Sequence, residues 1–293
     1  MRLSTLAITC VAACTLASAQ APAPQPPKAD AAASAAAEAT LAATRAALGG
    51  EKKLAAVKTL VATGRTRQVR GDNLVPIEFE IAIELPDRYV RKDEIPAQES
   101  EPTTVGFNGA ELIQLPAPGL TGRGGQPTPP AALEAARAAR LTNARQDFAR
   151  LTLGMFAASF DSFPLTFSYA AKAEAPQGKA DVIDVKGPNA FAARLFISAD
   201  THLPIMISWT PPAPRGGAAP PGRGDAPARG DAPARATSPP ETRIYYGDYR
   251  ETNGLTWPFR LRRAVGADTV EETTFDGFKI NPKIDPRKFE VKK

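Results

Sequence analysis

Residues 245–262 read YYGDYRETNGLTWPFRLR, and this stretch decides the fold class. The dipeptide Asn253-Gly254 is favoured in two-residue hairpin turns, because both central residues of such a turn need a positive φ. After it, Leu255, Trp257, Phe259 and Leu261 alternate with polar residues or proline, which is typical of a strand that covers a core with one face. A second turn at residues 266–268 leads into a third strand over residues 269–279. We therefore predict an antiparallel meander here.

The clearest strand signal in the rest of the chain lies at residues 75–85. Apolar and acidic residues alternate there, so a register slip of one residue would bury three carboxylates. The apolar row is Val75, Ile77, Phe79, Ile81, Ile83 and Leu85. The alternating acidic residues Glu78, Glu80 and Glu84 are expected on a solvated face rather than in a catalytic cleft. Further strands are expected on both sides of this row, so the sheet is predicted to be antiparallel throughout.

The first nineteen residues have the pattern of an export signal. Arg2 supplies the positive charge, residues 3–16 are mostly apolar, and Ala17-Ser18-Ala19 is a small-residue cleavage site. We expect cleavage before Gln20 and a periplasmic protein. The alternative is a lipoprotein: Val11-Ala12-Ala13-Cys14 is similar to a lipobox, which would anchor the chain through a lipidated Cys14.

The residues left after cleavage offer little catalytic chemistry. Both cysteines, Cys10 and Cys14, lie in the signal, so the mature chain would have no thiol nucleophile, disulfide or thiolate metal ligand. The single histidine, His202, is expected in a turn between two strands. No metal-protease, hydrolase or phosphate-loop motif occurs. We predict a protein that is not an enzyme and has no cofactor or metal.

The charge pattern and the remaining apolar segments limit the partners. The formal charge is +5 and falls to +4 without Arg2, and no basic patch with interleaved aromatic residues occurs. We therefore expect no nucleic-acid partner. No other segment is apolar enough to span a bilayer, so we expect no transmembrane span. We also expect a monomer.

The chain divides into a tether and one domain. Residues 20–40 are a Pro/Ala-rich tether and the start of a first helix, which is expected over Ala31–Leu48 and ends at Gly49-Gly50. Residues 41–293 form the domain. A long helix is expected over Ala131–Phe160, with an apolar stripe that includes Phe148, Leu151 and Met155. Residues 211–240 are a low-complexity Pro/Gly/Arg-rich insertion, expected to be disordered and to split a hairpin between Trp209 and Tyr245.

Three groups of short fragments carry a family resemblance. They are residues 48–60 (LGGEKKLAAVKTL) followed by Gly64, residues 200–204 (DTHLP), and residues 248–250 (DYR), 254–258 (GLTWP) and 280–289 (INPKIDPRKF). Together they resemble the outer-membrane lipoprotein-sorting (LolA/LolB-like) superfamily, and the resemblance covers nearly the whole mature domain. The dedicated carriers are shorter and lack an insertion like residues 211–240.

The resemblance implies an α+β fold: a strongly curved antiparallel sheet that forms an unclosed half-barrel, with helices covering its concave face. Members bind lipid or acyl groups in that concavity. The apolar row at residues 75–85, together with Trp209, Trp257 and Phe259, is then a candidate ligand face as well as a candidate core. Phe148, Leu151 and Met155 would belong to a lid helix. Lipid or the acyl chains of a lipoprotein are the expected ligands.

Two functions follow from these observations. The first is a non-catalytic periplasmic binder or carrier of lipid or acylated protein. The alternative is a cell-envelope interaction or sensor module that uses the same fold as a scaffold, with the insertion at residues 211–240 as a tether or as the docking segment for an envelope protein.

Overall fold

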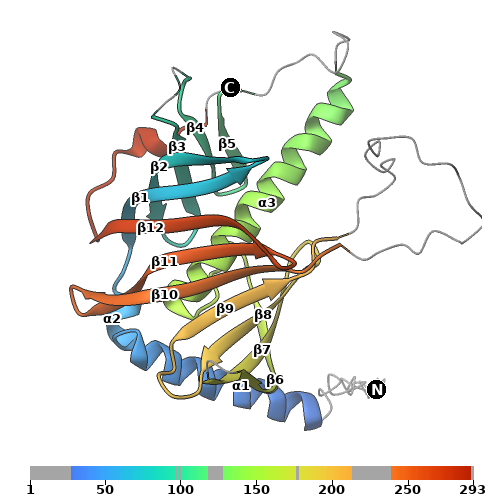
Figure 1. Cartoon of the computed structure of the whole chain (residues 1–293), viewed down its shortest axis with the longest axis vertical. Helices are drawn as coiled ribbons and strands as arrows, with labels where there is room; N and C mark the ends of the chain where they lie inside the picture. The colour runs from blue at the N-terminus through green and yellow to red at the C-terminus, as the bar shows by residue number, and fades with distance from the viewer. Residues whose placement is uncertain are drawn as a thin grey trace, which may run out of the picture.

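A computed structural model describes residues 28–96, 98, 100–117, 128–175, 178–212 and 239–291. The predicted export signal with Cys14, the first part of the tether and most of the insertion at residues 211–240 lie outside these residues. The described chain forms one antiparallel sheet of 12 strands that curves around a long helix (Figure 1). The sheet is not closed into a barrel, so the predicted unclosed half-barrel is confirmed.

The strands fall into two meanders. The first contains β1 (Thr59–Arg70), β2 (Asn73–Glu84), β3 (Arg88–Glu94), β4 (Thr103–Asn108) and β5 (Glu111–Leu115). The second contains β6 (Thr166–Ala175), β7 (Gly178–Gly187), β8 (Phe191–Ser198), β9 (Pro204–Trp209), β10 (Thr242–Thr252), β11 (Leu255–Val265) and β12 (Asp268–Ile280). The strand order is β5-β4-β3-β2-β1-β12-β11-β10-β9-β8-β7-β6. The first strand of the chain therefore pairs with the last at the centre of the sheet.

This order places β5 and β6, which follow each other in the chain, at opposite edges of the sheet. The link between them is α3 (Pro130–Phe156), a helix of 27 residues that spans about 40 Å and crosses the concave face (Figure 1). Its C-terminal half is buried against the sheet, whereas most of its first half is exposed. The topology therefore requires a long crossing on the concave side, and an amphipathic helix provides it.

The predicted hairpins are present. Asn253 and Gly254 both have positive φ, 54° and 74°, and join β10 to β11 as the Asn-Gly pattern predicts. Strands β9 and β10 pair directly, with Trp209 opposite Thr242, so the insertion does split a hairpin. The helix predicted to end at Phe160 ends earlier, at Phe156. Ala157 there has a left-handed φ of 48°, and Phe160 instead bridges to Phe163 and packs on Phe156 with 5.7 Å between ring centroids.

Two fragments of the family resemblance meet near the start of β1. Helix α1 (Lys28–Ala47) leads through Gly49-Gly50 into α2 (Glu51–Ala55). Leu48 accepts a backbone hydrogen bond from Thr256 (2.9 Å), and Lys53 donates to the carbonyl of Gly254 (3.1 Å). Any side chain at Gly49 would collide with the Gly254 carbonyl. The first helix is thus docked on the Asn-Gly hairpin that lies some 200 residues later.

A third fragment closes the same corner. Asn281 follows β12 with a positive φ of 54°. Its side-chain oxygen accepts from the backbone N–H of Lys58 (2.7 Å) and its amide donates to the carbonyl of Ala56 (3.0 Å). The side chain of Thr59 donates to the carbonyl of Pro282 (2.7 Å). These bonds align the start of β1 with the end of β12.

The C-terminal segment covers part of the convex face. The C-terminal segment forms a short 3-10 helix, η1 (Pro286–Phe289), and Phe289 packs on Ala82, Val90 and Ile113. Of the predicted solvated carboxylates, Glu80 forms an ion pair with Lys288 and Glu84 pairs with Arg88 (3.2 Å), while Glu78 is exposed. All three lie on the outer side of β2, as the alternation predicts.

Replacement of Asn281 tests how much its side-chain hydrogen bonds contribute to stability. Asn281→Ala removes hydrogen bonds to Ala56 and Lys58 and places alanine at positive φ, so we expect the free energy of unfolding to fall by about 2–3 kcal/mol. Asn253→Ala is the matched control, because Asn253 has the same φ but its side chain forms no hydrogen bond among the described residues; we expect a loss of about 1 kcal/mol. Chemical denaturation of both variants measures the difference. Equal losses would contradict the role of the side-chain bonds.

Candidate ligand cleft

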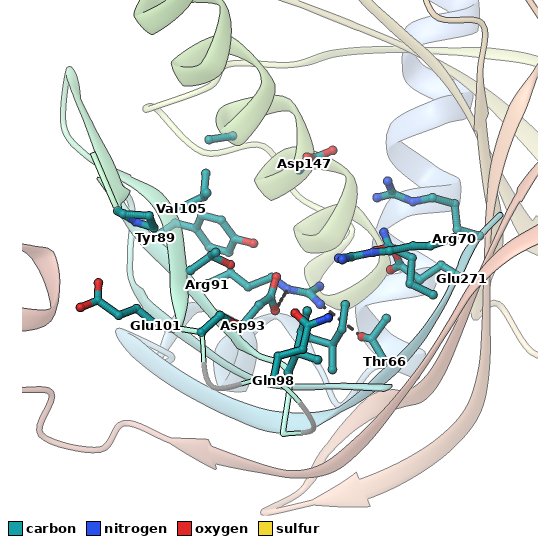
Figure 2. A pocket seen from close by; sticks show the side chains of 18 residues that line it. Thr66, Arg70, Tyr89, Arg91, Asp93, Gln98, Glu101, Val105, Asp147 and Glu271 are labelled. Atoms are coloured by element: carbon teal, nitrogen blue, oxygen red, sulfur yellow. Dashed lines mark hydrogen bonds and ion pairs between the residues drawn. The ribbon is translucent and has the colours of Figure 1, made fainter. Parts of the chain in front are cut away.

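A hollow with a volume of about 650 Å³ lies between α3 and the inner face of β1, β2, β3, β4, β11 and β12. This size is within the range of small-molecule sites in proteins. Figure 2 shows Tyr89 and Val105 on one wall and Thr66, Arg70 and Glu271 on the opposite wall, with Asp147 of α3 facing the space between them. Polar and charged side chains supply much of its lining.

A second, smaller hollow of about 110 Å³ continues the first one toward the interior. The two share Tyr89, Arg91, Asp147, Arg263 and Glu271, so they form one cleft with a wide mouth and a narrow inner pocket. The inner pocket adds a group of apolar side chains: Ile81, Leu151, Ile244, Leu261 and Phe275. The cleft therefore changes from polar at its mouth to partly apolar at its inner end.

Arg91 is held rigidly at the junction of mouth and pocket. Its guanidinium lies 4.7 Å from the ring centre of Phe79 and donates to Asp93 (2.7 Å) and to Thr66 (3.2 Å). Burial lowers the pKa of Arg91, but the charge and hydrogen bond of Asp93 outweigh this effect, so its pKa is raised. The group stays charged, and its Asp93 partner neutralises it locally.

Tyr246 and Arg150 hold α3 against the sheet. The hydroxyl of Tyr246 donates to the backbone carbonyl of Arg150 (2.7 Å), and its ring packs on Gly154, where any side chain would collide with it. Arg150 lies 4.1 Å from the ring centre of Trp209 and pairs with Asp147 (2.9 Å). Burial lowers the pKa of Arg150 even though Asp147 opposes the shift. These contacts fix the helix over the inner pocket.

Arg263 and Glu271 stand opposite each other on β11 and β12, and both line the cleft. The register of the two strands shifts directly after Arg263, which marks a β-bulge. Bulges redirect side chains and are common beside functional sites. Among the described residues neither side chain forms an ion pair, and the Nε of Arg263 is buried without a hydrogen-bond partner. Glu271 does accept a long hydrogen bond from the hydroxyl of Thr273 (3.4 Å), so the described residues leave this pair without a charged partner but not without contacts.

The predicted ligand-face residues divide into two groups. Ile77 lines the mouth, and Ile81 and Leu151 line the inner pocket. The others line neither part. Ile83, Trp257, Phe148 and Met155 are fully or almost fully buried, Phe79 and Phe259 are buried, and Val75, Leu85 and Trp209 are half-buried. Trp257, for example, stacks on Phe278 (5.4 Å) and meets Phe156 edge-on (5.3 Å). That a ligand contacts these residues stays a prediction.

Sequence reasoning missed the polar residues of the cleft, Tyr89, Arg91, Arg263 and Glu271 above all. The period-2 pattern gave a partial signal, since Thr66, Gln68 and Arg70 share the inner face of β1 with buried Leu60 and Ala62. On one face of a strand, a change from apolar to polar residues marks where the core ends. Recognising the cleft needed the pairing of β1 with β12, which no local pattern reveals.

The described residues include no group of three or more His, Cys, Asp or Glu that could hold a metal ion. None of the helices in the described part of the chain has the length and apolar character needed to cross a membrane. His202 lies in the turn between β8 and β9 with a positive φ of 56°, away from the cleft.

Comparisons with known proteins extend this picture. No family model matches the chain, and no curated protein matches it. Among solved structures, a LolA superfamily protein from Nitrosomonas europaea matches 86% of this chain and 96% of its own, with 9% identity and a TM-score of 0.51. The chain has a LolA-like fold.

Two further structures match at lower similarity. A DUF1329 family protein from Desulfovibrio piger matches 87% of this chain and 97% of its own, with 7% identity and a TM-score of 0.45. A domain from Vibrio parahaemolyticus, described as an outer-membrane lipoprotein-sorting domain, matches 86% and 97%, with 7% identity and a TM-score of 0.47.

Three buried tyrosines of the LolA-like sheet predict that the stability of the fold depends on pH. Burial raises the pKa of Tyr246, Tyr89 and Tyr249 well above the ordinary value of 10.0. A group whose pKa is higher in the folded state stabilises the fold below its unfolded pKa and loses this contribution as pH rises. The free energy of unfolding should therefore fall above about pH 10, by up to about 1.4 kcal/mol per pH unit for each such tyrosine.

Tyr246→Phe isolates one of these groups. At pH 7 it should lower the free energy of unfolding by about 1–2 kcal/mol, because the hydrogen bond from the buried tyrosine hydroxyl to the carbonyl of Arg150 is lost. Between pH 10 and the alkaline limit its stability should decline less steeply than that of the natural chain. Urea denaturation across this pH range checks both statements, and identical slopes for the two proteins would contradict the assignment.

Proposed function

We propose that the protein is a non-catalytic periplasmic binder or carrier of lipid or acylated protein. The observation that carries this proposal is the cleft under α3, which has a mouth of about 650 Å³ rich in polar residues and an inner pocket where apolar side chains of the sheet and of α3 join the charged ones. Such a gradient suits an amphiphile, with its head group at the mouth and its chain directed inward. The LolA-like fold supports the same conclusion.

The composition of the cleft supports a binding rather than a catalytic role. The described residues that line it include no histidine, cysteine or lysine. Asp93 and Asp147 are already paired with arginines, so neither is free to act as a base. What the cleft offers is hydrogen-bond donors and acceptors beside apolar surface, which is the composition of a recognition site.

The helix α3 is proposed as the lid of this cleft. The inner pocket, at about 110 Å³, is small for a long acyl chain, so uptake requires α3 to move away from the sheet. Besides apolar packing, the described residues hold the helix through the hydroxyl of Tyr246, Arg150 on the ring of Trp209, Arg145 on the Gly109 carbonyl (2.6 Å) and Arg140 on Gln114 (3.2 Å). Arg45 donates to the carbonyl of Ala157 at the helix end (3.2 Å). Displacement would open the packed apolar row of β2, including Phe79 and Ile83, to the ligand.

Filling the inner pocket tests the proposal. Leu261 lines it and is only half-buried, so Leu261→Trp should occupy the space without overpacking the core. We expect at least a tenfold weaker affinity for a fluorescent fatty acid, measured by titration, with an unchanged melting temperature. Ile205→Trp on β9 is the matched control, because Ile205 is an exposed apolar residue outside the cleft. Equal binding by both variants, or no binding by the natural chain, would sink the proposal.

The interaction or sensor module remains the alternative hypothesis. Its motivation, the insertion at residues 211–240, lies mostly outside the described residues. Deleting residues 213–238 separates the two functions, because β9 and β10 pair without them. Retained lipid binding with loss of an envelope partner would favour the scaffold.

A further inference from the structure

The strongest unexplained feature of the cleft is a pair of opposite charges that form no ion pair among the described residues. Four arginines and four carboxylates line the mouth and the inner pocket: Arg70, Arg91, Arg150, Arg263, Asp93, Glu101, Asp147 and Glu271. Arg91 pairs with Asp93, and Arg150 pairs with Asp147. Arg70 and Glu101 are exposed at the rim, where water solvates them. This leaves Arg263 and Glu271.

These two side chains are half-buried and close in the sheet, yet they do not satisfy each other. They are register partners on β11 and β12, and directly opposite residues of opposite charge usually attract. Among the described residues they form no ion pair, Glu271 accepts a side-chain hydrogen bond only from the hydroxyl of Thr273 (3.4 Å), and the Arg263 Nε is buried without an acceptor. A half-buried charge without a partner costs stability unless a ligand completes it.

The groups around them define what such a ligand must carry. The buried phenol of Tyr89 lines both parts of the cleft and forms no hydrogen bond among the described residues, so it is a donor available beside Arg263. Arg263 and Tyr89 together suit an anionic oxygen. Glu271 offers a carboxylate, which suits an ammonium group a few ångströms away. A purely anionic head group would meet Arg263 but be repelled by Glu271.

We infer that the cleft selects amphiphiles with a zwitterionic head group, in which a phosphate lies next to a primary ammonium. The phosphate binds Arg263 and Tyr89, and the ammonium binds Glu271. This inference rests on the proposed function, since the chain of the same molecule enters the inner pocket. It deepens that function by naming the class of head group and the two residues that select it.

Short-chain phospholipids below their micelle concentration test the inference by calorimetric titration. Dihexanoyl phosphatidylethanolamine should bind at least tenfold more tightly than the phosphatidylglycerol analogue, which lacks the ammonium. It should also bind more tightly than the phosphatidylcholine analogue, whose quaternary ammonium has no N–H to donate. Phosphoethanolamine without acyl chains should bind weakly.

Substitutions of the two charged residues should change the affinity for phosphatidylglycerol in opposite directions. Arg263→Gln should weaken binding of both phosphatidylethanolamine and phosphatidylglycerol at least tenfold. Glu271→Gln should weaken phosphatidylethanolamine but strengthen phosphatidylglycerol, because it removes the repulsion. Arg262→Gln and Glu272→Gln are matched controls on the outer face of the same strands, where Arg262 lies 4.4 Å from the ring centre of Tyr245 and Glu272 pairs with Arg260. Both controls should keep the natural preference, and circular dichroism verifies the folding of all four.

These measurements distinguish a failure of the head-group assignment from a failure of the proposed carrier function. Equal affinity for the three lipids, or an equal effect of Glu271→Gln on all of them, overturns the head-group assignment and leaves the carrier function standing. Phosphoethanolamine binding as tightly as its lipid form supports the charge pair but overturns the carrier function. Binding of neither lipid nor phosphoethanolamine overturns both.

Discussion

The structure depends on the pairing of β1 with β12. Every other strand pair joins neighbours in the described sequence, whereas this one joins residues about 200 positions apart and turns two meanders into one sheet. The pairing demands a close approach at Gly64, where the register shifts and a side chain would collide with the carbonyl of Thr274 and the ring of Phe79. Asn281 then fixes where the pairing ends. Without this pairing β1 and β12 would each be an unpaired edge strand.

The position of the cleft is a consequence of the pairing of β1 with β12. Because the first meander begins at the centre and the second one ends there, β5 and β6 lie at opposite edges, and the chain between them must cross the concave face. The crossing helix covers the apolar part of this face through its buried C-terminal half. Where the inner residues of β1, β11 and β12 become polar, at Thr66, Arg263 and Glu271, the helix and the sheet enclose the mouth of the cleft instead of packing together. Fold and site thus share one cause.

The parts predictable from sequence are those encoded by local pattern. The Asn-Gly hairpin, the facing of the row from Ile77 to Ile83 and the long helix before β6 are all present, because turn chemistry and hydrophobic period act over a few residues. The cleft is different. Arg91 and Glu271 come together only when β1 pairs with β12, and the period-2 pattern says which face a residue takes but not which strand lies beside it. The early end of α3 was also hidden, because the packing of Phe160 on Phe156 is tertiary.

The polar rows of the inner face are hard to explain by folding alone. Thr66 and Thr273 satisfy each other through their hydroxyls (2.9 Å), and Arg91 is neutralised by Asp93, so these positions cost the fold little. Arg263 and Glu271 are different, because a pair of apolar residues at the same register would extend the core of Leu261 and Phe275 without desolvating any charge. Local rules of this kind are broken mainly at functional sites, where a ligand restores what the free protein lacks. The concave face therefore combines two surfaces, one that stabilises the sheet and one whose charges, in our proposal, are completed by a ligand.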